Sequence, residues 1–305
     1  MIENMIKNFA SLIDRYGFIP NGNRSYYLSR SQPPLLLAHG GIISGGKGNE
    51  VYQEYLPALQ KEYNYWMDET GPTKHTVKMP DGSVLNRYYD QLDTPRPESY
   101  RQDVETSEAS KEDPKVIFRN LRSAAESGWD FSSRWFADGQ NITTIKTTDL
   151  VPVDLNCLLY HLEVTLARAF RVRGDAAKND LALAKEFDER AEQRKNAINQ
   201  YCWSPDANWY VDCDTKGELG QEITLAGVAP LFFELVPNER IERYRQSSER
   251  EFRSTRWCGD NPQGDKTAVG CSQRLGSAPV AHHKRAAELC AGRARQRYRR
   301  TLDSA

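Results

Sequence analysis

The sequence has few of the residues that would build a metal site, a disulfide scaffold or a membrane span. Its 305 residues include 6 cysteines and 5 histidines, with no Cys-x-x-Cys or His-x-x-x-His spacing. We therefore expect no metal, no cofactor and no disulfide framework. No apolar run approaches the ~20 residues of a membrane helix. Met1–Asn4 does not begin a basic stretch followed by an apolar one, so we expect neither a membrane partner nor a secretory signal here.

Positive charge is scarce in most of the chain and concentrated at its end. The net charge is -1, from 41 basic and 42 acidic residues. Phe252–Ala305 holds 11 basic and 4 acidic residues, a net +7, which leaves -8 for the rest. Such a tail could be a basic arm for nucleic acid or a membrane. Because the body has no nucleic-acid-binding motif, we expect no nucleic-acid partner and interpret 252–305 as a largely disordered segment outside the fold.

Apolar residues at helical spacing predict an all-α protein made of helical hairpins. The first expected helix spans 1–16 and stops at Gly17, and the second runs from Pro57, in its first turn, to about Thr70. A helix over Pro152–Phe170 is followed by a turn at Gly174–Asp175 and by a returning helix that ends at Tyr201. The last two expected helices are Thr224–Leu235, which we expect to be buried, and Pro237–Glu251. One β-hairpin is predicted, from His75–Met79 and Val84–Tyr88 around Asp81-Gly82. The expected architecture is an antiparallel array of helix pairs joined by long polar loops.

Four of these loops are rich in aromatic, amide and charged side chains. They span 18–34, 95–103, 125–135 and 147–156. Carboxylates, amides and guanidinium groups suit sugar hydroxyls, and aromatic rings suit the apolar faces of sugars, so carbohydrate is the favoured ligand class. Simpler interpretations stay open for single loops. Asn21 and Asn23 fit turn positions around Gly22, and Arg96 with Glu98 fits a solvated ion pair.

Asp130 is the candidate catalytic carboxylate. It lies between Trp129 and Phe131, and an apolar environment raises the pKa of a carboxyl group. A protonated carboxyl group is what a leaving glycosidic oxygen requires. The alternative is a helix N-cap followed by Ser132 and Ser133 in the first turn.

Four runs within these loops are distinctive: Pro20–Pro34 (PNGNRSYYLSRSQPP), Arg96–Arg101 (RPESYR), Glu126–Trp135 (ESGWDFSSRW) and Leu150–Asn156 (LVPVDLN). They closely resemble the corresponding runs of trehalases, inverting glycoside hydrolases that split α,α-trehalose into two glucose molecules. It covers about 1–35 and 47–251. The resemblance implies an (α/α)6 toroid with the active site at the loop end, and we expect residues 1–251 to form part of such a toroid.

The resemblance also implies roles for individual residues. Asp130 matches the general acid of the family. The positions that match its sugar-binding residues are Asn21, Arg30, Ser31, Gln32, Arg96, Pro97, Glu98 and Gly128, the last through its main chain. The expected partner is a small sugar, trehalose, bound by a monomer. The family occurs in several compartments, and we expect the periplasm or cytoplasm of a bacterium.

Two motifs of the family are missing from the sequence. One is an Arg-Phe-x-Glu-x-Tyr-x-Trp-Asp motif that precedes the first loop, and the other is a glycine run leading into Glu-Tyr-Pro, whose glutamate is the general base. We therefore expect this polypeptide to be inactive or nearly so. A non-catalytic sugar-binding or relic protein is the alternative, and a nucleic-acid-binding protein that uses the tail is a third possibility.

Two segments interrupt the resemblance in a way that suggests a changed reading frame. Leu36–Gly46 is glycine-rich where the family continues a helix, and a shifted frame can read MVELLA there. Thr267–Gly276 can likewise read QQWDAPNGWA, a trehalase motif at the expected place. We therefore expect 36–46 and 252–305 to be out of frame, which would account for the basic tail without a binding role.

Overall fold

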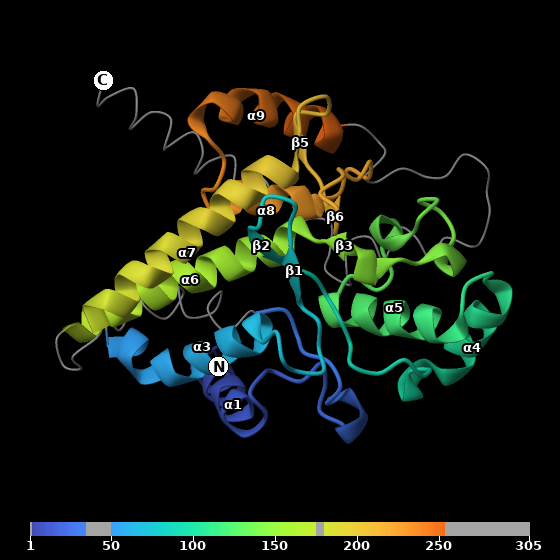
Figure 1. Cartoon of the computed structure of the whole chain (residues 1–305), viewed down its shortest axis with the longest axis horizontal. Coiled ribbons are helices and arrows are strands. Elements are labelled where there is room, and N and C mark those ends of the chain that lie inside the picture. Colours follow the sequence, from blue (N-terminus) through green and yellow to red (C-terminus); the bar gives the residue numbers. More distant parts are fainter. Residues whose placement is uncertain (1, 35–49, 175–179, 254–305) are drawn as a thin grey trace.

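The computed structural model describes residues 2–34, 50–174 and 180–253 (Figure 1). The hypothesis of a changed frame at 36–46 lies outside these residues. The interpretation of 252–305 as a disordered, out-of-frame tail also lies outside them, apart from the last two residues of the final helix.

The described residues form a mostly helical structure, as predicted. The α-helices are α1 (Ile2–Tyr16), α3 (Glu50–Met67), α4 (Tyr100–Ala109), α5 (Pro114–Ser127), α6 (Val153–Arg173), α7 (Asp180–Tyr201), α8 (Ala229–Phe232) and α9 (Asn238–Arg253). The strands form three short antiparallel pairs: β1 (Thr76–Lys78) with β2 (Val84–Asn86), β3 (Leu150–Val151) with β6 (Cys213–Asp214), and β4 (Trp203–Ser204) with β5 (Trp209–Tyr210). The first pair is the predicted hairpin. As predicted, α1 stops at Gly17, whose φ is +86°.

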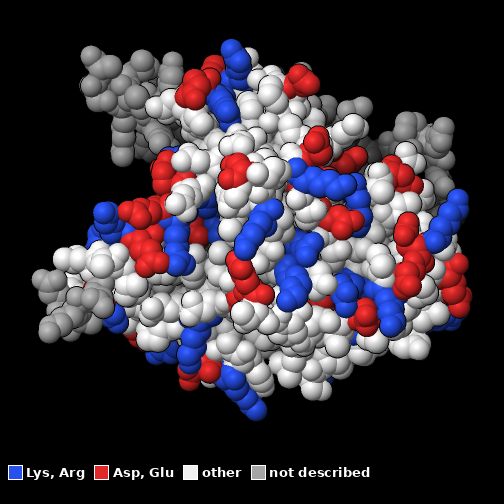
Figure 2. Space-filling view, in the orientation of Figure 1, with Lys and Arg blue, Asp and Glu red and all other residues white. Residues whose placement is uncertain are grey.

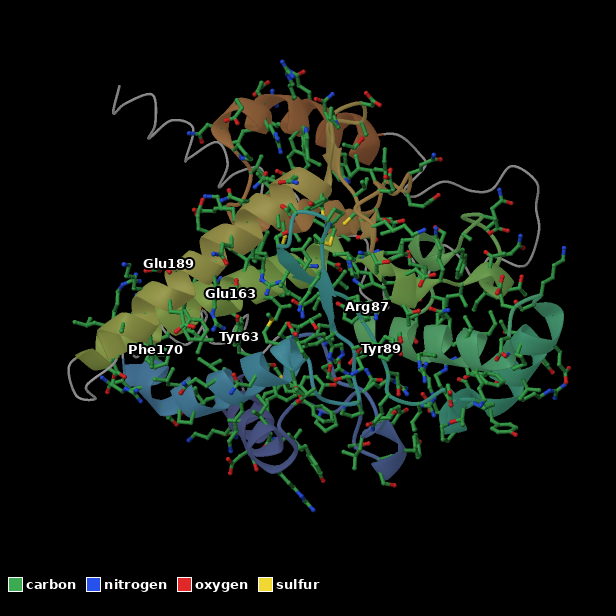
Figure 3. All side chains as sticks on the ribbon, viewed as in Figure 1. Tyr63, Arg87, Tyr89, Glu163, Phe170 and Glu189 are labelled. Atoms are coloured by element: carbon green, nitrogen blue, oxygen red, sulfur yellow. The ribbon has the colours of Figure 1, made fainter. Side chains whose placement is uncertain are left out.

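The predicted helical hairpin is the longest feature of the fold. Helices α6 and α7 run side by side, and α3 packs on α6 (Figure 1). Between them lies a buried ionic group in which Glu163 of α6 accepts hydrogen bonds from Arg194 Nε at 3.0 Å and Tyr63 Oη at 3.2 Å (Figure 3). Each charge and hydroxyl in this group has a partner, which is the condition for burying it in the core.

Two predicted helices are wrong in their extent. Pro57 lies inside α3, which begins at Glu50 rather than at the proline. The proline is exposed, while Leu56 and Leu59 are buried, so burial of the apolar face outweighs the backbone cost of the proline. Thr224–Leu235 is not one helix: it contains a 3-10 turn and the four-residue α8. Pro230 interrupts the hydrogen-bonding pattern there, and Phe232 is 50% exposed.

Helices α4 and α5 lie where the sequence predicted parts of two loops. Helix α4 is polar on nearly all sides and offers little periodicity. Helix α5 has clear local signals, because Asp113 caps its first turn by accepting from Lys115 N at 2.8 Å and Pro114 follows the cap. Its buried face, with Ile117 and Leu121, anchors the helix in the core. The end of α5 therefore has a fixed position, and the loop that contains Asp130 starts from it.

The core consists of two hydrophobic clusters that meet beside this loop. One cluster lies among α1, α3, α5 and α6, and the other gathers the short strands with α7 and α9. Trp129 packs against both. Within the described ranges no helix is long and apolar enough to span a bilayer. On the face shown in Figure 2, acidic and basic side chains are interspersed.

We expect the stability of the fold to fall as pH rises above about 5, because of Glu62 on α3. This side chain is buried, and within the part of the chain that the structure describes its Oε2 has no hydrogen-bond partner. Burial raises the pKa of its carboxyl group to about 8 from an ordinary 4.5. Between pH 4.5 and pH 8 the carboxyl group of Glu62 is ionised in the unfolded chain but remains protonated in the folded chain. The free energy of unfolding therefore declines with rising pH. At ~1.4 kcal/mol per pKa unit the upper limit of this loss is ~5 kcal/mol.

Glu62→Gln tests this. Urea denaturation at pH 5 and pH 8 should show a decline for the wild type that the variant lacks. Glu54→Gln, an exposed change on the same helix, is the control and should retain the wild-type decline. Equal pH dependence in wild type and Glu62→Gln would contradict the assignment.

Candidate active site

The first loop is closed on itself by backbone hydrogen bonds. Asn21 N donates to Arg30 O at 3.1 Å and Gln32 N donates to Ile19 O at 2.7 Å, on either side of an antiparallel bridge between Pro20 and Ser31. Arg30 and Ser31 are consequently buried, while Gln32 is half-buried. Three candidate residues thus lie consecutively on a short extended segment.

Asn21 is more than a turn residue. Its Nδ2 donates to Ser31 O at 3.0 Å and to Ala125 O of α5 at 3.2 Å, and its Oδ1 accepts from Arg30 Nε at 3.0 Å. Gln32 Nε2 completes the group by donating to Asn21 O at 2.6 Å. The amide hydrogens of Asn21 are therefore occupied by protein contacts, and the residue joins the first loop to the end of the third loop's helix.

Arg30 joins the first loop to the second. Its side chain is only 1% exposed and its Nη2 pairs with Glu98 Oε1. Its Nη1 lies 3.7 Å from Asp90 Oδ2 and has no hydrogen-bond partner among the described residues. The guanidinium carbon lies 5.2 Å from the centre of the Tyr27 ring. Glu98 thus pairs with Arg30, and the alternative of a local ion pair with Arg96 is not what the structure contains.

Arg96 has a carboxylate partner of its own. Asp103 on α4 accepts from Arg96 Nη2 at 2.7 Å, from Nε at 3.0 Å and from the backbone N at 2.8 Å. The guanidinium carbon also lies 4.8 Å from the centre of the Phe131 ring, which belongs to the third loop. Pro97, exposed, starts the 3-10 helix Pro97–Ser99 that carries Glu98. The second and third loops therefore meet at Arg96.

A tight turn after α5 presents Asp130. Gly128 ends the helix in the left-handed conformation, with φ +73°, that glycine adopts without strain. The turn is closed by Ser132 N donating to Trp129 O at 2.7 Å. Asp130 is not a helix N-cap: Ser132 caps the following 3-10 helix, Ser133–Trp135. That alternative for Asp130 is therefore wrong, and its side chain is exposed.

The environment of Asp130 favours the protonated carboxyl group. Surrounding protein atoms reduce its hydration although it touches solvent, and this desolvation raises its pKa above the ordinary value. The charges of Arg96 and Arg30 act to lower the pKa, and Glu98 acts to raise it. Because both arginines are paired with carboxylates, their effect on Asp130 does not reverse the rise. An exposed carboxyl group that retains its proton can transfer it to a bound ligand.

Several residues that organise these loops were not singled out from the sequence. Arg134, fully buried, donates to Asp212 Oδ1 at 2.6 Å and to Asp154 Oδ1 at 3.0 Å, which ties the third loop to the fourth. Asp154 and Arg134 belong to runs that carry the family resemblance, so a search for charged partners among those runs could have found them. Asp212 has no such signal.

The site residues with predicted roles are accordingly brought together. Asn21, Arg30, Ser31, Gln32, Arg96, Glu98, Gly128 and Asp130 are linked through direct contacts or through adjacent residues of the first three loops. Among the described residues there is no cluster of three or more potential metal ligands.

Comparisons with known proteins identify the family of the chain. A family model described as trehalase matches residues 1–269. A periplasmic trehalase of Xanthomonas oryzae pv. oryzae is 49% identical over 249 residues, which cover 79% of this chain and 43% of the relative. A periplasmic trehalase of Salmonella paratyphi B is 46% identical over 250 residues, with the same coverage. The chain thus spans less than half the length of these relatives.

A solved structure shows the same fold. A neutral trehalase from Saccharomyces cerevisiae superposes with a TM-score of 0.67 at 23% identity, over 81% of this chain and 49% of that one. The likeness confirms the predicted all-α architecture and identifies the helix pairs as part of an (α/α)6 toroid.

Removing the partner of Arg96 should strongly destabilise the protein. Asp103→Ala leaves a buried guanidinium without its carboxylate, and such a loss typically costs about 3–5 kcal/mol. Glu105→Ala, two residues later on α4, breaks only the exposed ion pair with Arg101 and should cost below ~0.5 kcal/mol. Urea denaturation of both variants measures the difference. A loss for Asp103→Ala no larger than that for Glu105→Ala would contradict the burial of this pair.

Proposed function

Because the chain belongs to the trehalase family, we propose that it binds α,α-trehalose and supplies the general acid for hydrolysis to two glucose molecules. The observation that carries the proposal is the environment of Asp130. It is an exposed carboxyl group with a raised pKa, beside the paired side chains of Arg30, Arg96 and Glu98. All four positions match residues to which the family motifs give the acid and sugar-binding roles.

The proton transfer follows from this placement. Asp130 gives its proton to the bridging oxygen as the bond from that oxygen to the anomeric carbon breaks. Water attacks the anomeric carbon from the opposite face and loses a proton to a second carboxylate, which gives inversion. In inverting glycosidases the two carboxyl groups lie about 6.5–9.5 Å apart to leave room for this water.

The sugar would be held by groups whose hydrogen-bonding capacity the protein does not use up. The bonds of Arg96 to Asp103 leave its Nη1 outside them, and Gln32 uses only its Nε2 in the contact with Asn21. Phe131 is half-buried, and its ring presents apolar surface beside the Arg96 guanidinium. Polar groups that meet hydroxyls, next to aromatic rings that meet C–H faces, suit a small sugar.

Whether bound trehalose is also hydrolysed depends on the second carboxylate, the general base. The family's base belongs to the Glu-Tyr-Pro motif, which this sequence does not contain. We therefore propose that the polypeptide as given binds trehalose with little turnover, and that hydrolysis takes place in a protein that includes the motif. A sugar-binding protein without catalysis is the second candidate, favoured by the same observation. Titration of the chain with trehalose, together with an assay for released glucose, separates the two.

A periplasmic location is part of the proposal. It is supported by the relatives from Xanthomonas and Salmonella, whose names describe them as periplasmic trehalases. Cell fractionation of the source bacterium, with an antibody against the chain, tests it.

Asp130→Asn should abolish most turnover and leave binding largely intact. Asparagine has nearly the same size but cannot donate the proton, and general acid catalysis contributes on the order of 10²–10⁴ in rate. Glucose release is measured in a protein that includes the Glu-Tyr-Pro segment, and trehalose binding is measured by calorimetry in the chain as given. Asp149→Asn, an exposed change in the fourth loop, is the matched control and should be unaffected. Wild-type turnover by Asp130→Asn would show that the acid is another residue.

Glu98→Gln should move the alkaline limb of the pH–rate profile to lower pH. The acid must be protonated to act, so activity falls as pH rises through its pKa. Glu98 acts to raise the pKa of Asp130 and also neutralises Arg30, so its removal lowers that pKa. Glu105→Gln, exposed on α4, should leave the profile in place. A limb that stays fixed or moves to higher pH in Glu98→Gln would contradict the proposed electrostatics.

A further inference from the structure

Glu126 is a fully buried carboxylate just before the turn that carries Asp130. It lies in the last turn of α5 and is 0% exposed. Its Oε1 accepts from Ser31 Oγ at 2.8 Å and from Ser31 N at 3.0 Å. Its Oε2 accepts from Tyr89 N at 2.9 Å, and His75 Nε2 lies 3.2 Å from both oxygens. One side chain therefore contacts three other segments of the chain.

The contacts of Glu126 favour its ionised form. Burial acts to raise the pKa of this carboxyl group, but His75 and the Ser31 donors outweigh burial and hold the pKa below its ordinary value. Hydrogen bonds to an ionised acceptor are roughly twice as strong as those between neutral groups. The segments that meet at Glu126 are consequently held firmly.

Two of the three segments that Glu126 holds lead to the site. Ser31 is flanked by Arg30 and Gln32. Tyr89, labelled in Figure 3, precedes Asp90, whose Oδ2 lies 3.7 Å from Arg30 Nη1. The chain runs from Glu126 through Gly128 to Asp130 within one short turn. The segment 30–32 and the turn that carries Asp130 are therefore both connected to the carboxylate of Glu126.

We propose that Glu126 is a positioning residue, which sets the place of Asp130 relative to the segment 30–32. It is placed to hold segments rather than to transfer a proton to a ligand, because its side chain is fully buried and both of its oxygens accept hydrogen bonds. Its effect on trehalose affinity rests on the proposed function, whereas its effect on the geometry of these segments does not.

Glu163 provides a matched control for the general effect of losing a buried carboxylate. It is 1% exposed, is paired with Arg194 and accepts from Tyr63, so that its partners lie on α7 and α3 rather than on the first three loops (Figure 3). Loss of either carboxylate leaves buried donors unpaired, so both changes should destabilise the protein. Only the loss of Glu126 should disturb the site.

The experiment compares Glu126→Gln with Glu163→Gln by amide hydrogen exchange and by calorimetric titration with trehalose. In Glu126→Gln, exchange should accelerate at least ~10-fold in peptides covering 29–32 and 128–131, and the dissociation constant should rise about tenfold. In Glu163→Gln, faster exchange should be confined to α3, α6 and α7, and affinity should be retained. Glu126→Asp, which keeps the charge but is one methylene shorter, should show the same pattern in weaker form and serves if the glutamine variant does not fold.

The outcomes separate the two proposals. If exchange at 29–32 and 128–131 changes no more in Glu126→Gln than in Glu163→Gln, the positioning role is overturned. If the exchange pattern is as expected but the affinity for trehalose is unchanged, the proposal that Glu126 positions the binding site is overturned. If the wild-type chain does not bind trehalose, the proposed function fails, and the exchange pattern still decides whether Glu126 fixes the two segments.

Discussion

Burial of the arginine side chains is the constraint on which the loop end of this structure depends. A guanidinium group removed from water needs a carboxylate partner, because an unpaired charge in the interior costs several kcal/mol. Arg30, Arg96 and Arg134 are each almost fully buried, and each finds its partner on another segment or further along the chain. These charges are satisfied by pairs that join the first loop to the second and the third loop to the fourth, segments that are distant in the sequence.

The same pairing determines the chemistry available to Asp130. If the guanidinium of Arg30 or Arg96 were free, its charge would stabilise the carboxylate form of a neighbouring acid. Glu98 and Asp103 occupy these cations instead, so desolvation is the larger influence on Asp130 and its pKa rises. The arginines thus lie beside Asp130 without reversing the rise in its pKa.

The parts of the fold that could be predicted from the sequence are those with local signals. The α6–α7 hairpin follows from apolar periodicity interrupted at Gly174, and the β1–β2 hairpin from Asp81-Gly82. Pro57 misled the prediction, because burial of a helix face overrides a local preference. For the site, the motifs indicated the residues near the ligand, but not the partners that fix them. Arg134 and Asp212 are 78 positions apart, and nothing in the local sequence of either residue specifies such a pairing.

Trp129 connects the turn that carries Asp130 to both halves of the interior. Its side chain packs on both hydrophobic clusters, and its backbone is adjacent to Asp130. A shift of one cluster against the other would therefore displace this ring and the neighbouring carboxyl group, even if the helices of each cluster stayed intact.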